Sequence, residues 1–124
     1  VRYLSELFKI GAKLSVPFVA VVVRKCYGLG AQAMLSGSTL NPSYTLSWPQ
    51  GEFGAMGLEG AVKLGFQKQL DAITSRGERQ KMYDKLLAQQ YENGKALEVA
   101  SVLEIDAVIE PQETRRVLAH SFGF

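Results

Sequence analysis

The residues of this sequence best placed to do chemistry are the glycines at 28 and 30. With Ala33 they match the pattern G-x-G-x-x-G/A, and they follow an apolar run at residues 16–23. In such a turn the backbone N–H groups are exposed, and the helix that follows adds the positive end of its dipole. The turn could therefore hold a phosphate, stabilise an oxyanion, or only let a strand and a helix pack closely.

A dinucleotide-binding turn is the first of these alternatives, and the spacing argues against it. In that fold the first glycine follows its strand closely, and an acidic residue ends the next strand about 20 residues later. Here residues 24–27 separate the apolar run from Gly28, Gly37 cuts the helix short, and Glu52 lies in a glycine-rich loop after Pro49. A dinucleotide-binding oxidoreductase fragment therefore remains only as a second hypothesis.

Hydrophobic periodicity predicts the elements that position the turn. An amphipathic helix ends near Leu14, and the β-branched run at 18–23 is typical of a strand covered on both faces in a parallel sheet. A short helix follows the turn and is stopped by Gly37. The remaining predicted elements are a strand at 44–48, helices over 58–73, from Glu78 to a break at 93–94, and over 96–101, a strand at 106–109 and a closing helix from Pro111 to Gly123.

The composition is that of one globular domain. Of the 124 residues, 47% are apolar and 21% are charged, which suits a protein with a hydrophobic core. The formal charge of +2 is spread among residues of both signs, so we expect no nucleic acid partner. Apolar runs fall far short of the ~20 residues that span a bilayer, so we expect no membrane segment.

The scarcity of catalytic side chains is itself informative. One cysteine, Cys26, and one histidine, His120, leave no set for a disulfide or a zinc site. We expect an intracellular, metal-free protein in which Cys26 packs in the interior. Glu52 and Glu59 flank a glycine-rich loop, and we interpret them as hydrogen-bonded to turn backbone rather than as a catalytic carboxylate pair.

Three sequence blocks occur in an order that is more specific than any one glycine pattern. They are Arg24-Lys25-x-Tyr27-Gly28, then Trp48-Pro49-x-x-Glu52-Phe53-x-x-Met56-Gly57-x-Glu59-Gly60-Ala61-Val62, then Asp106-x-Val108-Ile109-x-Pro111-x-Glu113-Thr114-Arg115. Together they resemble the carboxyltransferase (beta) component of biotin-dependent acyl-CoA carboxylases, of the acetyl-/propionyl-CoA carboxylase type, in its C-terminal half. The resemblance covers nearly the whole chain but well under half of a complete family member.

The resemblance implies an α/β fold of the ClpP/crotonase-like superfamily, a spiral of β-β-α units of which this chain is a partial domain. Residues 1–124 would be a fragment of the C-terminal acyl-CoA carboxyltransferase domain, its biotin-side half. The N-terminal half would bind acyl-CoA and stabilise its enolate. Because the sequence opens at Val1 without an initiator Met, we expect it to be cut from a longer chain, and we expect the isolated fragment to be inactive.

The implied reaction is transfer of a carboxyl group from carboxybiotin to the α-carbon of an acyl-CoA. By motif position, the backbone N–H groups of Leu29 and Gly30 would form the oxyanion hole for the biotin ureido oxygen. Tyr27, Gly28, Ala31 and Trp48 would lie on the biotin side of the site, and no metal is required. A non-catalytic, crotonase-like interaction piece is the third hypothesis.

The resemblance also implies the partners. Biotin would be carried on a partner subunit or domain, so that the chain would work with a biotin carboxyl carrier and a biotin carboxylase component. Further partners would be the N-terminal half of the same carboxyltransferase, acyl-CoA, and other copies in a homo-oligomer. We expect a cytoplasmic location, or the mitochondrial matrix in a eukaryote.

Overall fold

The computed structural model describes residues 2–124, and its strands and helices follow a repeated β-β-α order. The first unit consists of β1 (Val19–Val22), β2 (Lys25–Tyr27) and α2 (Gly28–Met34). The second consists of β3 (Tyr44–Ser47), β4 (Glu52–Gly54) and α3 (Leu58–Gly65). A last strand, β5 (Ala107–Val108), follows after three more helices. The predicted α/β fold built from β-β-α units is confirmed.

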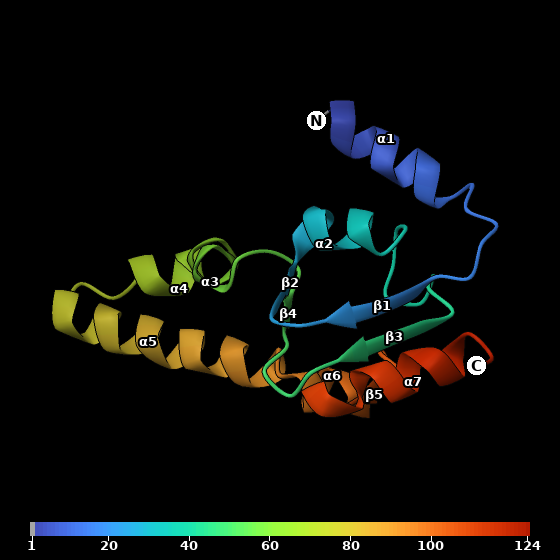
Figure 1. The fold of residues 1–124 in the computed structure, drawn as a ribbon. Helices are drawn as coiled ribbons and strands as arrows, with labels where there is room; N and C mark the ends of the chain where they lie inside the picture. The colour runs from blue at the N-terminus through green and yellow to red at the C-terminus, as the bar shows by residue number, and fades with distance from the viewer. Residues whose placement is uncertain (1) are drawn as a thin grey trace.

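Equivalent strands of the successive units pair with one another, and all of these pairs are parallel. The first strands form one sheet in the order β1-β3-β5, and the second strands form a two-stranded sheet, β2-β4. The register places Val19 opposite Tyr44 in the first sheet and Cys26 opposite Phe53 in the second. Each strand thus returns beside its predecessor after one turn of the spiral, as Figure 1 shows for β1 and β3.

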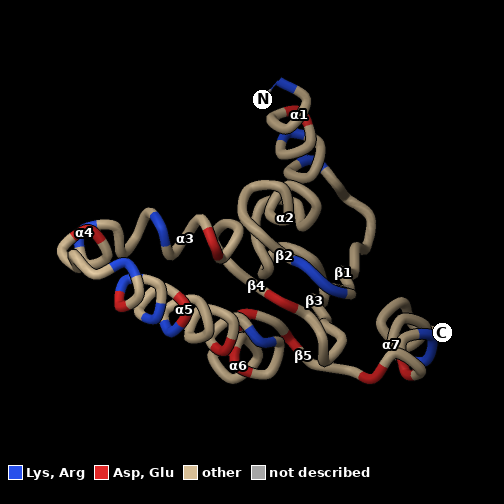
Figure 2. Tube along the Cα trace, turned by 90° about the vertical axis from the view of Figure 1, so that its left-hand side faces the viewer, with Lys and Arg blue, Asp and Glu red and all other residues tan. Residues whose placement is uncertain are grey.

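The remaining helices lie outside the two β-β-α units. They are α1 (Arg2–Gly11), α4 (Gln67–Asp71), α5 (Arg76–Asn93), α6 (Ala96–Ser101), the 3₁₀ turn η1 (Pro111–Glu113) and α7 (Thr114–Ser121). The long helix α5 runs beside α3 and α4 and projects away from the sheets (Figure 1). Charged residues of both signs are scattered along these helices (Figure 2).

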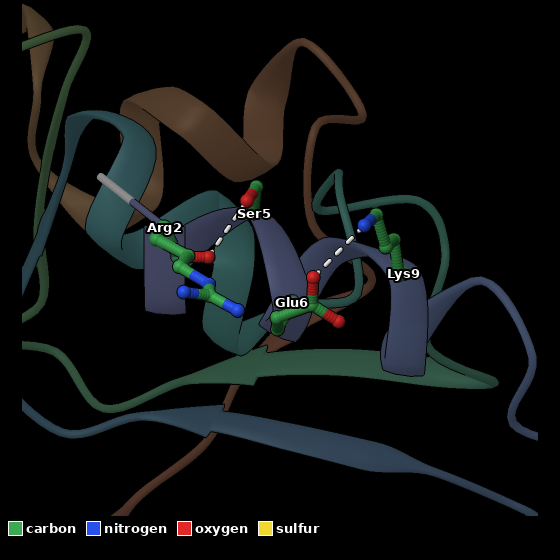
Figure 3. Close-up of polar contacts among 4 residues, drawn as sticks. All are labelled: Arg2, Ser5, Glu6 and Lys9. Carbon is green, nitrogen blue, oxygen red and sulfur yellow. Dashed lines mark hydrogen bonds and ion pairs between the residues drawn. The ribbon is translucent and has the colours of Figure 1, made fainter.

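Helix α1 packs on α2 rather than on a sheet. An added Cβ at Gly11 would stand 2.8 Å from the Cα of Ser36, so the two backbones approach closely there. Figure 3 shows the polar side of α1, where Lys9 Nζ lies 2.8 Å from Glu6 Oε1 and Ser5 donates to the Arg2 carbonyl at 2.7 Å. Across residues 2–124, none of the helices combines the length and the apolar character needed to cross a membrane.

The core lies where the two sheets meet α6. Its members are buried apolar side chains from both sheets and the adjoining helices: Ala20, Val22, Cys26, Leu35, Phe53, Ala96 and Ile105. Strand β1 buries Ala20 and Val22 and leaves Val19 and Val21 half-buried. Within the described residues, the predicted covering of both strand faces is therefore complete on one face only.

Buried polar groups in β3 are satisfied locally. Thr45 and Ser47 are both fully buried. The Thr45 hydroxyl donates to the Thr39 carbonyl at 2.6 Å, and the Ser47 hydroxyl donates to the Trp48 carbonyl at 2.9 Å. Because an unpaired buried hydroxyl would destabilise the fold, these bonds explain how polar residues occupy the centre of the sheet.

Several predicted boundaries were wrong. The helix predicted over 58–73 is two helices, because Phe66 leaves the helical region (φ −113°, ψ 16°) and is both the last cap of α3 and the first cap of α4. Gly65 beside it lowers helix propensity at this point. Helix α5 begins at Arg76, two residues before the start predicted near Glu78, since the Ser75 hydroxyl caps it by accepting from the Glu78 N–H.

The strands β2 and β4 were missed because each has only three residues and neither shows an apolar alternation. Both depend on long-range pairing with one another. Strand β4 also contacts the corner between α5 and α6, where the Phe53 N–H donates to the Gly94 carbonyl at 2.8 Å. Tertiary context, not local propensity, makes these residues strands.

Candidate functional site

The glycine turn joins β2 directly to α2. Tyr27 is the last residue of β2 and caps α2 with an extended backbone (φ −120°, ψ 132°). Gly28 then takes φ +59°, and a Cβ there would also stand 3.1 Å from the Ala55 carbonyl oxygen. A left-handed backbone costs a non-glycine residue about 1–2 kcal/mol. The turn therefore places its left-handed residue at a glycine and leaves Leu29 unstrained.

Leu29 and Gly30 follow in the first turn of α2, where N–H groups have no partner inside the helix. Among residues 2–124 neither N–H has a hydrogen-bond acceptor. Both residues are exposed, and a Cβ at Gly30 would meet no atom within 4 Å. The turn thus presents two adjacent backbone donors to an open surface, an arrangement that can bind an oxyanion.

A hollow of about 800 Å³ lies beside this turn, between α2 and the corner that joins α5 to α6. Its lining includes Gly28 and Ala31 of α2, Cys26 of β2, Phe53 of β4 and Gly94 at the corner of α5 and α6. Of the six predicted site residues, only Gly28 and Ala31 are part of this lining. Leu29 and Gly30 lie at the surface beside it.

Tyr27 lies on the other face of the two-stranded sheet, because side chains alternate along a strand and Cys26 faces the core. Its hydroxyl donates to Glu52 Oε2 at 2.6 Å. Burial, and next the bond to Glu52, raise the pKa of Tyr27 well above its usual value. The phenol is therefore a neutral hydrogen-bond donor.

The two glutamates have partners that the sequence analysis missed. Glu52 begins β4 instead of lying in a loop, and its carboxylate accepts from Tyr27 rather than from turn backbone. For Glu59, its own backbone N–H and then the Tyr91 hydroxyl, at 3.2 Å, lower the pKa of the carboxyl. The two carboxylates are held by different tyrosines and do not form a pair. The Tyr27–Glu52 contact depends on the register between β2 and β4, which cannot be predicted from the sequence alone.

Cys26 packs in the interior, as predicted. Its side chain is buried in the core cluster, and burial raises the pKa of its thiol. A raised pKa disfavours the thiolate, which is the nucleophilic form. Cys26 is therefore a packing residue, and within residues 2–124 no group of three or more His, Cys, Asp and Glu side chains is placed to hold a metal ion.

Trp48 lies just beyond the end of β3, apart from the glycine turn. Its indole N–H donates to the Thr114 hydroxyl at 2.9 Å, and the ring is half-buried. This bond joins the end of β3 to the first residue of α7. The structure thus gives Trp48 a role in packing, and its place on the biotin side stays a prediction.

The predicted gap between the strand and Gly28 was wrong. Residues 25–27 are themselves a strand, so Gly28 does follow a strand directly. Two other features still differ from a dinucleotide-binding fold. Helix α2 is short, with seven residues, and Glu52 begins the neighbouring strand, whereas in that fold an acidic residue ends it. The turn geometry alone therefore leaves the choice of anion open.

Comparison with known proteins narrows this choice. Residues 1–123 match the family model of the carboxyl transferase domain. The chain is 30% identical to the propionyl-CoA carboxylase beta chain of Saccharopolyspora erythraea, over 98% of this chain and 22% of that protein. It is 28% identical to the methylmalonyl-CoA carboxyltransferase 12S subunit of Propionibacterium freudenreichii subsp. shermanii, over 96% of this chain and 22% of that protein. The chain thus spans less than a quarter of either relative.

The similar solved structures are also of an acyl-CoA carboxylase and a transcarboxylase. A single-chain, multi-domain long-chain acyl-CoA carboxylase superposes with a TM-score of 0.78 at 44% identity, covering 96% of this chain and 11% of that one. Transcarboxylase 12S, described as a hexamer with methylmalonyl-CoA and methylmalonic acid bound, superposes with a TM-score of 0.85 at 26% identity. It is covered over 23% of its length, and this chain over 98%.

Proposed function

Because the chain belongs to the carboxyl transferase domain family, we propose that it is part of an enzyme that transfers a carboxyl group from carboxybiotin to the α-carbon of an acyl-CoA. Its fold is the crotonase-like fold of carboxyltransferases. Since it spans less than a quarter of the first relatives, the proposal concerns the complete protein. Within that protein we assign residues 1–124 to the biotin-side half of the C-terminal domain.

The observation that carries the proposal is the pair of unpaired backbone donors at the start of α2. Leu29 and Gly30 present N–H groups that have no acceptor among residues 2–124, and no side chain at Gly30 restricts access. A ureido oxygen that gains negative charge is a suitable acceptor for two such donors. The residues present therefore fit a biotin headgroup, with Tyr27, Gly28 and Ala31 forming the turn that supports them.

In the proposed mechanism the chain supplies positioning and electrostatic stabilisation. When bound, carboxybiotin supplies the carboxyl group that is transferred. The N–H groups of Leu29 and Gly30 donate to the ureido oxygen and stabilise the charge that develops there as the carboxyl group leaves. Such fixed donors need no reorganisation during the reaction. The α-proton of the acyl-CoA would pass to the biotin anion that remains when the carboxyl group leaves, so no side chain of this chain needs to act as acid or base. The other half of the carboxyltransferase would stabilise the acyl-CoA enolate.

The proposed partners follow from assigning the biotin side of the site to this chain and the acyl-CoA side to the other half. Biotin is carried on a biotin carboxyl carrier, which is loaded by a biotin carboxylase component. The N-terminal half of the carboxyltransferase completes the site and binds acyl-CoA. Assembly as a homo-oligomer is supported by the hexamer described for transcarboxylase 12S. The proposed location is the cytoplasm, or the mitochondrial matrix in a eukaryote.

The test is an assay of the complete protein with carboxybiotin and acyl-CoA. We expect carboxylated acyl-CoA to form, and we expect isolated residues 1–124 to form none because the CoA-binding half is missing. A parallel titration with NAD(H) should show no binding. Binding of NAD(H) without carboxyl transfer would support the dinucleotide hypothesis, and neither activity in a folded protein would support a non-catalytic interaction piece.

A further inference from the structure

We propose that Glu52 is a positioning residue for the oxyanion turn and that it acts through the side chain of Tyr27. The inference rests on the proposed function, because it assumes that the N–H groups of Leu29 and Gly30 bind the reacting oxygen. It assigns no contact between Glu52 and substrate. Its basis is the arrangement of β2 and β4 immediately before the turn.

The register of the two strands brings the two side chains together. Lys25 lies opposite Glu52, and Tyr27 lies opposite Gly54. Because alternate residues share a face, Tyr27 and Glu52 lie on the same face as diagonal neighbours. Gly54 has no side chain, and a Cβ there would stand 3.4 Å from Tyr27 Cδ1. The ring is thus free to extend past Gly54 toward Glu52, where its hydroxyl donates at 2.6 Å.

The hydrogen bond to Glu52 fixes Tyr27, whose position affects the directions of the N–H groups of Leu29 and Gly30. Tyr27 immediately precedes Gly28, whose backbone has φ +59°. Glycine is the residue with the widest choice of backbone angles, so the directions of the next two N–H groups depend on how firmly both sides of Gly28 are held. Strand pairing holds the Tyr27 backbone, and Glu52 holds its ring. An oxyanion hole needs its donors held to about 0.5 Å.

The chain also contains a matched control. Tyr91 on α5 donates to Glu59 on α3 at 3.2 Å, a second tyrosine–glutamate hydrogen bond. Both of these residues lie outside the β2–α2 junction. Tyr91→Phe therefore removes a hydroxyl from the same kind of bond and leaves the Tyr27–Glu52 bond in place, while Tyr91 and Glu59 still lie near enough to Tyr27 to contribute to its raised pKa.

The test measures carboxyl transfer by the complete carboxyltransferase carrying Tyr27→Phe, Glu52→Ala, both changes together, Glu52→Gln or Tyr91→Phe. We expect Tyr27→Phe and Glu52→Ala each to lower kcat roughly 10- to 100-fold with the KM for acyl-CoA unchanged. The double variant should be no slower than the slower single variant, because the two single changes break the same hydrogen bond. Glu52→Gln keeps an acceptor oxygen and should stay within a few-fold of wild type, as should Tyr91→Phe.

Three results would overturn the inference. They are wild-type kcat in folded Tyr27→Phe, multiplied losses in the double variant, or an equal loss in Tyr91→Phe. If Glu52→Ala fails to fold, Tyr27→Phe decides, because it removes only a hydroxyl. If removing the Gly30 N–H lowers transfer while Tyr27→Phe does not, the positioning role fails and the proposed function stands. If neither change affects transfer, the proposed function fails first.

Discussion

Gly30→Pro in the complete carboxyltransferase should lower kcat for carboxyl transfer by roughly 10²- to 10³-fold, which is the typical effect of losing one oxyanion donor. Proline has no N–H, so the change deletes one of the two proposed donors. Position 30 lies in the first turn of α2, where the N–H has no helical acceptor, so proline removes no helical hydrogen bond. The assembly should therefore persist while the chemical step slows. Steady-state kinetics with carboxybiotin measure the effect directly.

Gly30→Ala is the matched control for this variant. It keeps the N–H, and a Cβ at this position meets no atom within 4 Å. The backbone at Gly30 lies outside the left-handed region, unlike that of Gly28. Gly30→Ala should therefore retain turnover within a few-fold of wild type. Unchanged turnover in a folded Gly30→Pro protein would remove Gly30 from the oxyanion hole, and an equal loss in both variants would indicate crowding of the site instead.

The fold was predictable wherever a long apolar pattern or a cap marks an element. The β-branched run at 18–23 gave β1, and Gly123, with φ +82°, ends the last helix as expected. At the end of α2 the prediction was close but displaced by one residue. The turn to positive φ begins at Ser36 (φ 59°), one residue before Gly37, which also has a positive φ of 116° and whose N–H donates to the Gln32 carbonyl at 2.7 Å. A serine in this position has no sequence signal, because glycine is the usual choice.

The candidate site was predictable in its backbone and not in its side-chain contacts. The glycine pattern identified the turn, because a left-handed backbone at position 28 favours glycine and so leaves a mark in the local sequence. The Tyr27–Glu52 bond instead spans 25 positions and depends on the pairing of two short strands. Trp48 was grouped with the site on motif position alone, whereas its indole bonds to Thr114 on α7. Long-range register is the information that a single sequence lacks.

Gly94→Ala should destabilise the protein, and Gly60→Ala should stabilise it, although both replace a glycine near a helix. At Gly94 an added Cβ would collide with the Phe53 carbonyl oxygen. That oxygen is backbone, and the Phe53 N–H and Gly94 carbonyl are already bonded at 2.8 Å, so neither side can move freely. Overpacking of this kind costs roughly 1–3 kcal/mol. Gly60 lies inside α3, where a Cβ meets nothing within 4 Å.

The contrast separates close packing from backbone flexibility as the reason for a glycine. Gly60→Ala should raise the free energy of unfolding by about 0.4–1 kcal/mol, because alanine restricts the unfolded chain. The thermal unfolding midpoint of the complete protein should therefore be highest for Gly60→Ala, lower for wild type and lowest for Gly94→Ala. Because Gly94 holds β4 beside the corner of α5 and α6, its replacement should also displace Phe53 and Glu52. Gly94→Ala should therefore lose carboxyl transfer as well as stability, and a variant that unfolds at or above the wild-type temperature would contradict the close approach seen at Phe53.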